Sequence, residues 1–182
     1  MRCVPSDSRA TFSTLVSSDL ARYVGREAPW WTALPRGLSR PGLWATLVVR
    51  AQQRLHARGH RRAAALLRGV GVVTVGIDVD AGAQIGPGVW FEHPVGVVIG
   101  NGVVVGSGAT LAQGVTLGVR QSLATSAADF PVLGDDVFVG ARASVLGAVT
   151  VGDGAVVAAH SLVLDDVAPG ATVVGLPARP VG

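Results

Sequence analysis

The sequence predicts a mainly β protein whose body is a stacked solenoid, preceded by a small α-helical N-terminal region. A small aliphatic side chain recurs at every sixth position over most of residues 79–174, a glycine often follows it, and further small apolar residues recur between these steps. A short fixed period of this kind is the signature of a solenoid, in which each coil stacks on the one before. The six-residue steps carry Val79, Ile85, Phe91, Ile99, Val105, Leu111, Leu117, Leu133, Val139, Val145, Val151, Val157 and Val163.

The composition agrees with this class. Aromatic residues make up 5% and charged residues 15% of the 182 residues, and 25 residues are glycine. These values suit a narrow solenoid with tight corners better than an ordinary globule. We divide the chain into a helical region over residues 1–70 and a solenoid domain over residues 71–182.

The helical region is expected to contain three helices. Apolar side chains at three- and four-residue steps predict the first over about residues 11–33. Pro41 suits the first turn of a second helix, which we expect to continue to about Arg58. A third helix is predicted over about residues 60–67.

Glycine and proline mark the two ends of the solenoid. Gly69 and Gly71 are expected to end the third helix, so that residues 72–77 form a strand that enters the solenoid. The repeat is lost near Pro169, and residues 175–179 are expected to be an irregular closing segment.

The charge pattern does not favour a nucleic-acid partner. The formal net charge is +3, and every basic residue is an arginine. Six arginines follow a helical spacing without the aromatic residues that would stack on bases, so we interpret them as a solvated helix face. They are Arg50, Arg54, Arg58, Arg61, Arg62 and Arg68.

Three features of the sequence bear on the cellular location of the protein. Cys3 is the only cysteine, which excludes an intrachain disulfide and is typical of a reducing cytoplasm. The first residues lack the apolar core of a signal peptide, and no stretch has the apolar length of a membrane span. We therefore expect a cytoplasmic protein with no membrane partner.

Two interruptions of the repeat, near His93 and over residues 120–132, hold the residues with the most suggestive chemistry. With the repeat itself, several segments resemble the hexapeptide-repeat acyltransferases, and among them the serine O-acetyltransferases. The resemblance implies a left-handed parallel β-helix and an acetyl-CoA-dependent O-acetyltransferase that acts on serine or a serine-like small acceptor. The segments are residues 41–43, 76–79, 92–96, 113–118, 140–143, 146–147 and 175–179.

The resemblance assigns catalysis to His93, with Asp78 as its supporting carboxylate one coil earlier. An alcohol is a poor nucleophile at neutral pH, and an imidazole, with an ordinary pKa of about 6.5, can remove its proton. A carboxylate behind the imidazole selects its tautomer and stabilises its cation. Glu92 corresponds to a family aspartate that helps to hold the amino group of serine, and Glu27 falls near a second one.

One part of the expected serine site departs from the family. The serine enzymes place an Arg-His pair before a proline to hold the serine carboxylate, whereas this chain has Asp129 and Phe130 before Pro131. Asp129 would repel a carboxylate. Arg120 is the candidate replacement, and the identity of the acceptor stays open.

For the acyl donor, the resemblance implies acetyl-CoA lying in a groove between neighbouring solenoids. Gly118, Ala141 and Ala159 match positions where pantetheine passes backbone amides, and Arg179 is placed to meet CoA phosphates. The family is trimeric, so we expect a homotrimer in which His93 faces the CoA-binding groups of the next copy. The sequence lacks the family's tail that binds cysteine synthase, and we expect no such complex.

Other functions compete with this hypothesis. A β-helical carbonic anhydrase needs three histidines around zinc, but the solenoid contains only His93 and His160, so we expect no metal. An acetyltransferase acting on a sugar, an amino sugar or a specialised metabolite remains an alternative, as does a non-catalytic trimeric scaffold.

Overall fold

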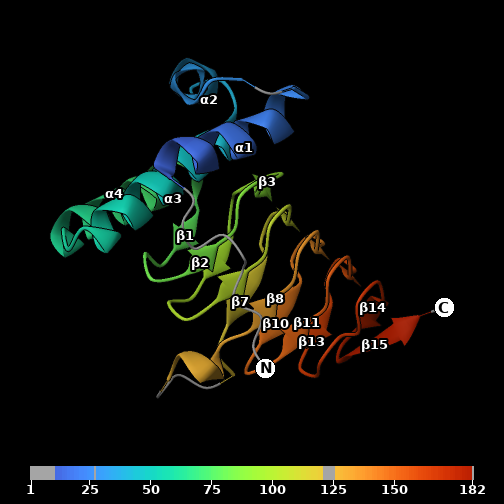
Figure 1. Ribbon diagram of the computed structural model, residues 1–182. Helices are drawn as coiled ribbons and strands as arrows, with labels where there is room; N and C mark the ends of the chain where they lie inside the picture. The colour runs from blue at the N-terminus through green and yellow to red at the C-terminus, as the bar shows by residue number, and fades with distance from the viewer. Residues whose placement is uncertain (1–10, 27, 121–125, 182) are drawn as a thin grey trace.

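The computed structural model describes residues 11–26, 28–120 and 126–181, which form a parallel β solenoid with helices across its N-terminal end (Figure 1). Glu27 therefore lies outside the described residues. Each coil contributes one short strand to each of three sheets, so the solenoid is triangular in section. The helical elements are α1 (Phe12–Val24), the 3-10 turn η1 (Trp30–Thr32), α2 (Ala33–Gly37), α3 (Pro41–Ala57) and α4 (Arg61–Val75).

The three sheets are called A, B and C in the order in which the chain visits them. Sheet A contains β1 (Asp78–Val79), β4 (Val98–Ile99), β7 (Thr116–Gly118), β10 (Ser144–Leu146) and β13 (Leu162–Val163). Sheet B contains β2 (Gln84–Ile85), β5 (Val104–Val105), β8 (Val132–Leu133) and β11 (Thr150–Val151). Sheet C contains β3 (Trp90–Phe91), β6 (Thr110–Leu111), β9 (Phe138–Val139), β12 (Val156–Val157), β14 (Thr172–Gly175) and β15 (Ala178–Val181).

The six-residue period corresponds to the inner column of each sheet. In sheet A, Val79 pairs with Ile99 and Ile99 with Leu117, each at most 2% exposed. Successive side chains of a strand point to opposite faces, so one residue of each two-residue strand enters the core and its neighbour faces outward. Stacking the same aliphatic position coil on coil makes one continuous core, as the sequence predicts.

The helical region differs from the prediction in the number of its helices and in where they end, since η1 and α2 follow α1 and since α4 extends beyond residue 67. The first helix ends at Val24 instead of continuing to residue 33, because Gly25 takes a left-handed conformation (φ 71°) that terminates it. The helix predicted from Pro41 is confirmed as α3.

The strand predicted over residues 72–77 is wrong, because α4 continues to Val75 and ends at Gly76 (φ 70°). Gly71 belongs to the helix and permits close packing, since an added Cβ would lie 3.2 Å from Ile77 Cγ2 and 3.4 Å from Val48 Cγ1. The boundary that we drew between residues 70 and 71 falls inside this helix.

The closing segment is also more regular than predicted. β14 and β15 form an antiparallel pair in which Val174 is opposite Arg179, and the Leu176–Pro177 peptide bond at the turn is cis. β15 therefore covers the last edge of sheet C, which would otherwise offer unpaired backbone groups.

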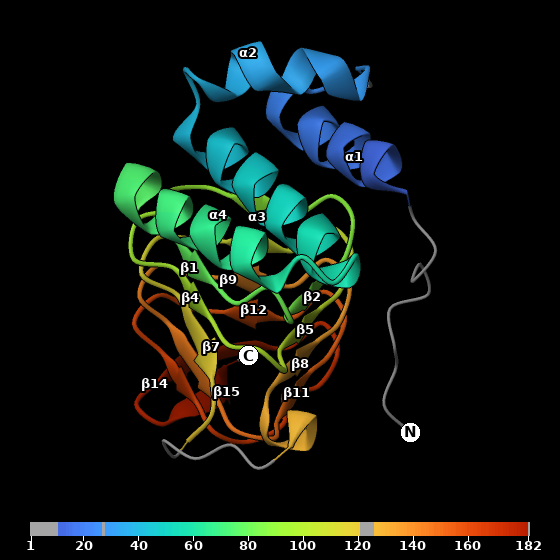
Figure 2. The ribbon, with the colours of Figure 1, turned by 90° about the vertical axis from the view of Figure 1, so that its left-hand side faces the viewer.

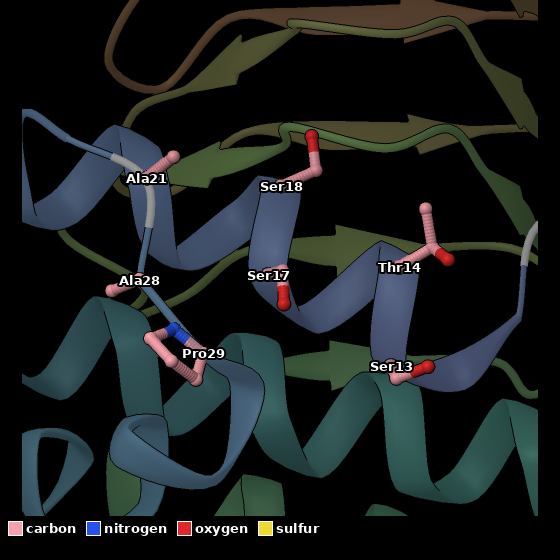
Figure 3. Close-up of a pocket in the computed structure, with 7 residues that line it drawn as sticks. All are labelled: Ser13, Thr14, Ser17, Ser18, Ala21, Ala28 and Pro29. Carbon is pink, nitrogen blue, oxygen red and sulfur yellow. The ribbon is translucent and has the colours of Figure 1, made fainter.

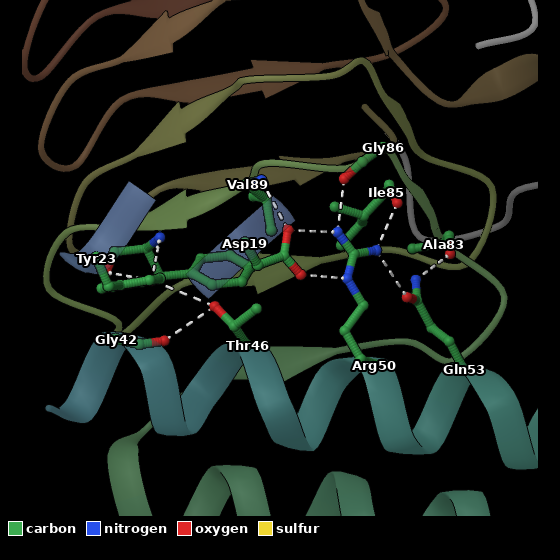
Figure 4. Close-up of polar contacts among 11 residues, drawn as sticks. Asp19, Tyr23, Gly42, Thr46, Arg50, Gln53, Ala83, Ile85, Gly86 and Val89 are labelled. Atoms are coloured by element: carbon green, nitrogen blue, oxygen red, sulfur yellow. Dashed lines mark hydrogen bonds and ion pairs between the residues drawn. The ribbon is translucent and has the colours of Figure 1, made fainter. Parts of the chain in front are cut away.

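Helices α1, α3 and α4 lie across the first coil of the solenoid (Figure 2). An ion pair between α1 and α3 joins these two helices to that coil (Figure 4). Arg50 Nε donates to Asp19 Oδ2 at 2.7 Å, and Arg50 also donates to the carbonyl oxygens of Ile85 and Gly86, each at 2.6 Å. Asp19 Oδ1 accepts the Val89 amide at 3.1 Å. Arg50 is 2% exposed, so the prediction that the arginines form a solvated helix face is wrong for this residue.

Tyr23 makes a second contact between α1 and the first coil. Its hydroxyl accepts a hydrogen bond from the Phe91 amide at 3.0 Å and lies 3.2 Å from the Thr46 hydroxyl, and the side chain is partly buried. Burial raises the pKa of Tyr23 to about 12 from its ordinary 10. The native state thus disfavours the phenolate.

We expect the folding stability to fall as the pH rises from 10 to 12. Below pH 10 the phenol is neutral in the folded and the unfolded chain, so the contribution of Tyr23 to stability is fully present. Between pH 10 and pH 12 the phenol ionises in the unfolded chain but not in the folded one. This difference lowers the free energy of unfolding by about 3 kcal/mol. Tyr23 is the only tyrosine, so the phenolate absorbance of the folded protein reports this group alone. A midpoint close to 10 in the folded protein would contradict the prediction, and Tyr23→Phe should abolish the absorbance change.

Candidate active site

The predicted site residues lie mainly at two of the three edges of the solenoid. The C–A edge joins each sheet C strand to the next sheet A strand and comprises residues 92–97, 112–115, 140–143 and 158–161. The A–B edge joins each sheet A strand to the next sheet B strand and includes residues 80–83, 100–103, 119–120, 126–131 and 147–149. In a triangular solenoid these edges are separated by the width of sheet A.

His93 and Glu92 lie side by side in sequence at the top of the C–A edge, and both side chains are exposed. The backbone of this corner is hydrogen-bonded to the turns on either side. The Gly96 amide donates to the Gly76 carbonyl at 2.8 Å, and the Gly114 amide donates to the Val95 carbonyl at 3.0 Å. The backbone of this corner is therefore held in place, while the imidazole of His93 remains accessible to a substrate.

Asp78 begins β1, in the coil adjoining this corner. Its amide donates to the Val97 carbonyl at 2.8 Å, and its backbone pairs with Val98. The predicted base and its predicted carboxylate thus belong to neighbouring coils at the same edge. The Asp78 carboxylate accepts a hydrogen bond from Arg68 Nε on α4.

Ala141 and Ala159 continue the C–A edge below His93. The Arg142 amide donates to the Gln113 carbonyl at 2.8 Å, and the His160 amide donates to the Ala141 carbonyl at 2.8 Å. Ala159 is exposed and Ala141 is half-buried, so both backbones can be approached by a long thin ligand. The structure therefore brings two of the predicted CoA positions to the edge that carries His93.

The remaining loop residues lie at the A–B edge. Gly118 ends β7, and an added Cβ there would meet no atom of the described residues within 4 Å, so they leave its outer side open. Arg120 lies along Gly147 and donates to the Leu164 carbonyl, toward the C-terminal coils.

Asp129 and Phe130 are engaged within the chain. Asp129 Oδ2 accepts the Ser126 amide at 2.9 Å and completes the capping of the short helix η2 (Ala127–Asp129). The Phe130 ring covers Gly100 and Gly102, since a Cβ at Gly102 would lie 2.3 Å from Phe130 Cδ2. The two residues that replace the family's Arg-His pair therefore have evident structural roles in this loop.

Arg179 lies far from His93, at the last coil. Its Nη1 donates to Asp165 Oδ2 at 3.2 Å, and both side chains are exposed. An exposed ion pair of this kind is weak, so the guanidinium can exchange Asp165 for a phosphate at little cost.

Two further features bear on alternative functions. Among the residues that the structure describes, there is no group of three or more His, Cys, Asp or Glu side chains placed to hold a metal ion. None of the described helices is long and apolar enough to cross a membrane.

A groove along α1 lies in the helical region (Figure 3). Hydroxyl and small apolar groups line it, so its described lining residues offer none of the charged or aromatic groups expected of a CoA site. Its lining residues are Ser13, Thr14, Ser17, Ser18, Ala21, Ala28 and Pro29.

Sequence reasoning missed Arg68 as a partner of Asp78. The only signal was that a helical arginine precedes the turn at Gly76, and spacing alone does not reveal which side of α4 packs on the solenoid.

Comparison with known proteins identifies the family. The bacterial transferase hexapeptide (six repeats) family matches residues 130–165. The serine acetyltransferase of Helicobacter pylori is 38% identical over 141 residues, which cover 78% of this chain and 81% of that protein. The serine acetyltransferase of Escherichia coli is 36% identical over 142 residues, which cover 78% of this chain but only 51% of that protein. The chain thus spans about half the length of some curated relatives that it matches.

Solved structures agree with the sequence relatives. The serine acetyltransferase of Neisseria gonorrhoeae superposes with a TM-score of 0.83 at 33% identity, over 94% of this chain and 65% of that one. This similarity confirms the predicted left-handed parallel β-helix with an N-terminal helical region. With its repeats, its helical region and its relatives in agreement, the chain belongs to the serine acetyltransferase family of hexapeptide-repeat proteins.

Proposed function

We propose that this protein transfers the acetyl group of acetyl-CoA to the hydroxyl of serine. The observation that carries the proposal is the exposed His93 at an anchored solenoid edge, in a chain 38% identical to a serine acetyltransferase. Glu92 beside it supplies a negative charge that can attract the amino group of the acceptor.

In the proposed reaction His93 removes the proton of the serine hydroxyl as its oxygen attacks the acetyl carbonyl carbon. The tetrahedral intermediate collapses with breakage of the carbon–sulfur bond, and His93 returns the proton to the leaving thiolate, so the products are O-acetylserine and CoA. Asp78 orients the imidazole and stabilises its cation, and backbone amides hold the oxyanion. Small residues at Ala141 and Ala159 leave room for the pantetheine arm, and Arg179 is available to the CoA phosphates.

The proposal includes a homotrimer. His93 lies at the C–A edge, whereas Gly118 and the 126–131 segment lie at the A–B edge, so one chain does not bring them together. A neighbouring copy that faces its A–B edge to this C–A edge would complete the site. A cytoplasmic location, inferred from the single cysteine, is part of the same proposal.

A second candidate acceptor is favoured by one observation. Asp129 caps η2 and Phe130 packs on Gly100 and Gly102, so neither provides the cation that would hold the serine carboxylate. An acceptor without a carboxylate, such as an amino alcohol, a sugar or an amino sugar, would not need it.

The deciding measurement is the release of CoA thiol with L-serine and with 2-aminoethanol, which is serine without its carboxylate. If the carboxylate is recognised, kcat/KM should favour serine by about tenfold or more, the value of a charge-assisted hydrogen bond. Equal or better turnover of 2-aminoethanol, or turnover of a sugar alone, would overturn serine as the acceptor. No turnover with any acceptor would support the scaffold alternative.

A further inference from the structure

Arg68 bridges two carboxylates at the entrance of the solenoid. Its Nε donates to Asp78 Oδ1, and its Nη1 donates to Asp80 Oδ2 at 3.0 Å. The arginine comes from α4 and the acids from the start of sheet A, so the bridge joins the helical region to the first coil.

The local backbone explains why both acids reach one guanidinium. Val79 is 2% exposed and points into the core, so Asp78 and Asp80 on either side of it face outward together. Gly76 reverses the chain after α4, which returns β1 to the helix that carries Arg68. The planar guanidinium fork can then bond to both acids at once.

Asp80 is itself held by the backbone. Its Oδ1 accepts the Gly82 amide at 3.0 Å, so the guanidinium is tied to a fixed point on one side. The hydrogen bond to Asp78 raises the pKa of Arg68 while partial burial opposes it, so this side chain stays charged. The three groups together carry one net negative charge.

The bridge adjoins the predicted base. Asp78 pairs with Val98 in the strand that follows the His93 corner, and Gly76 bonds to Gly96 within that corner. Two other charged side chains belong to this edge: Glu92 precedes His93, and the Arg142 side chain lies against Gly114, whose amide bonds to Val95 of the corner.

We propose that Arg68 is a positioning residue, which holds the Asp78 carboxylate in the orientation that it needs to support His93 and leaves a single negative charge behind the imidazole. This inference rests on the proposed function. Without Arg68, Asp78 would be free to rotate, and the negative charges of Asp78 and Asp80 would be left uncompensated.

We expect Arg68→Gln to lower kcat by about tenfold or more, because a misplaced catalytic group loses rate steeply. The KM for acetyl-CoA should stay unchanged. The acid limb of the kcat/KM profile should move to higher pH, because the added negative charge favours the imidazole cation. Arg68→Lys, which keeps the charge, should recover part of the rate.

The double variant Arg68→Gln with Asp80→Asn distinguishes positioning from simple support of the fold. It restores the original net charge without restoring the bridge, so the acid limb should return toward its original pH while kcat stays low. The matched control is Arg62→Gln, an exposed arginine on the same helix, which should change neither readout.

A second readout does not depend on turnover. The titration of the His93 imidazole is followed by NMR, with the resonance assigned by its loss in His93→Ala. A higher midpoint in Arg68→Gln supports the inference even if the wild-type protein turns over no acceptor, in which case only the proposed function fails. Wild-type turnover with an unmoved midpoint and an unchanged kcat in Arg68→Gln overturns the inference and leaves the proposed function intact. If Arg68→Gln loses kcat as expected but the titration midpoint of His93 does not move, the inference is also overturned, because that result indicates a purely structural role for Arg68.

Discussion

Replacement of His93 by alanine is expected to lower kcat with serine by about a hundredfold or more. The reason is that the serine hydroxyl then has no positioned base, and the departing thiolate has no positioned acid. The backbone of the corner is held by the hydrogen bonds of the Gly96 and Gly114 amides, which do not involve the exposed imidazole, so the corner should survive the substitution. Steady-state thiol release measures the effect, and calorimetric titration measures CoA binding, which should be nearly unchanged.

The control for this experiment is His60→Ala. His60 is exposed at the start of α4, away from the C–A edge, and its loss should leave kcat close to the wild-type value. Unchanged turnover in His93→Ala would remove His93 from the mechanism. A parallel loss of CoA binding would indicate a collapsed edge and not a missing base.

Replacement of Arg50 by methionine is expected to lower the free energy of unfolding by about 3–5 kcal/mol. Arg50 donates hydrogen bonds to the Asp19 carboxylate and to the carbonyl oxygens of Ile85 and Gly86. Methionine cannot donate them, so the substitution leaves these three groups without the guanidinium. Burial raises the pKa of Asp19 and the charge and hydrogen bonds of Arg50 lower it, so the substitution removes the main contribution that favours the carboxylate. Urea denaturation followed by circular dichroism measures the loss.

Two further variants test this explanation. Arg58→Met removes an exposed arginine of the same segment and should change stability by about 0.5 kcal/mol or less. Asp19→Leu in the Arg50→Met background removes the orphaned charge and should recover part of the loss, but not all of it, because the Ile85 and Gly86 carbonyls stay unpaired. Equal stability of Arg50→Met and Arg58→Met would show that the buried pair contributes little.

Much of the solenoid follows from the sequence because its packing repeats. The inner position of every coil is occupied by a residue such as Val79, Ile99 or Leu117, so the core has the same six-residue period as the chain. The interruption at His93 stands out against that period, and the resemblance to the serine O-acetyltransferases predicts that the histidine there is the base.

The helical region was predicted less well because its boundaries depend on tertiary contacts. Gly69 and Gly71 predict the end of a helix, yet α4 runs through both to Val75, because Gly71 packs against Ile77 and Val48. Residues 175–179 lack the repeat, yet β15 pairs with β14, because the last sheet edge offers free backbone groups.

The sequence by itself determined the stacked core and its two interruptions, since the core follows a short repeat and each interruption is a local departure from it. It also carries the family resemblance that predicts His93 as the base. Only the tertiary structure decided the roles of the charged residues. Arg50 and Arg68 belong to the same helical pattern of arginines, but one is buried against Asp19 and the other bridges Asp78 and Asp80. The physical reason is that the role of a charge depends on which groups cover it, and those groups come from distant parts of the chain.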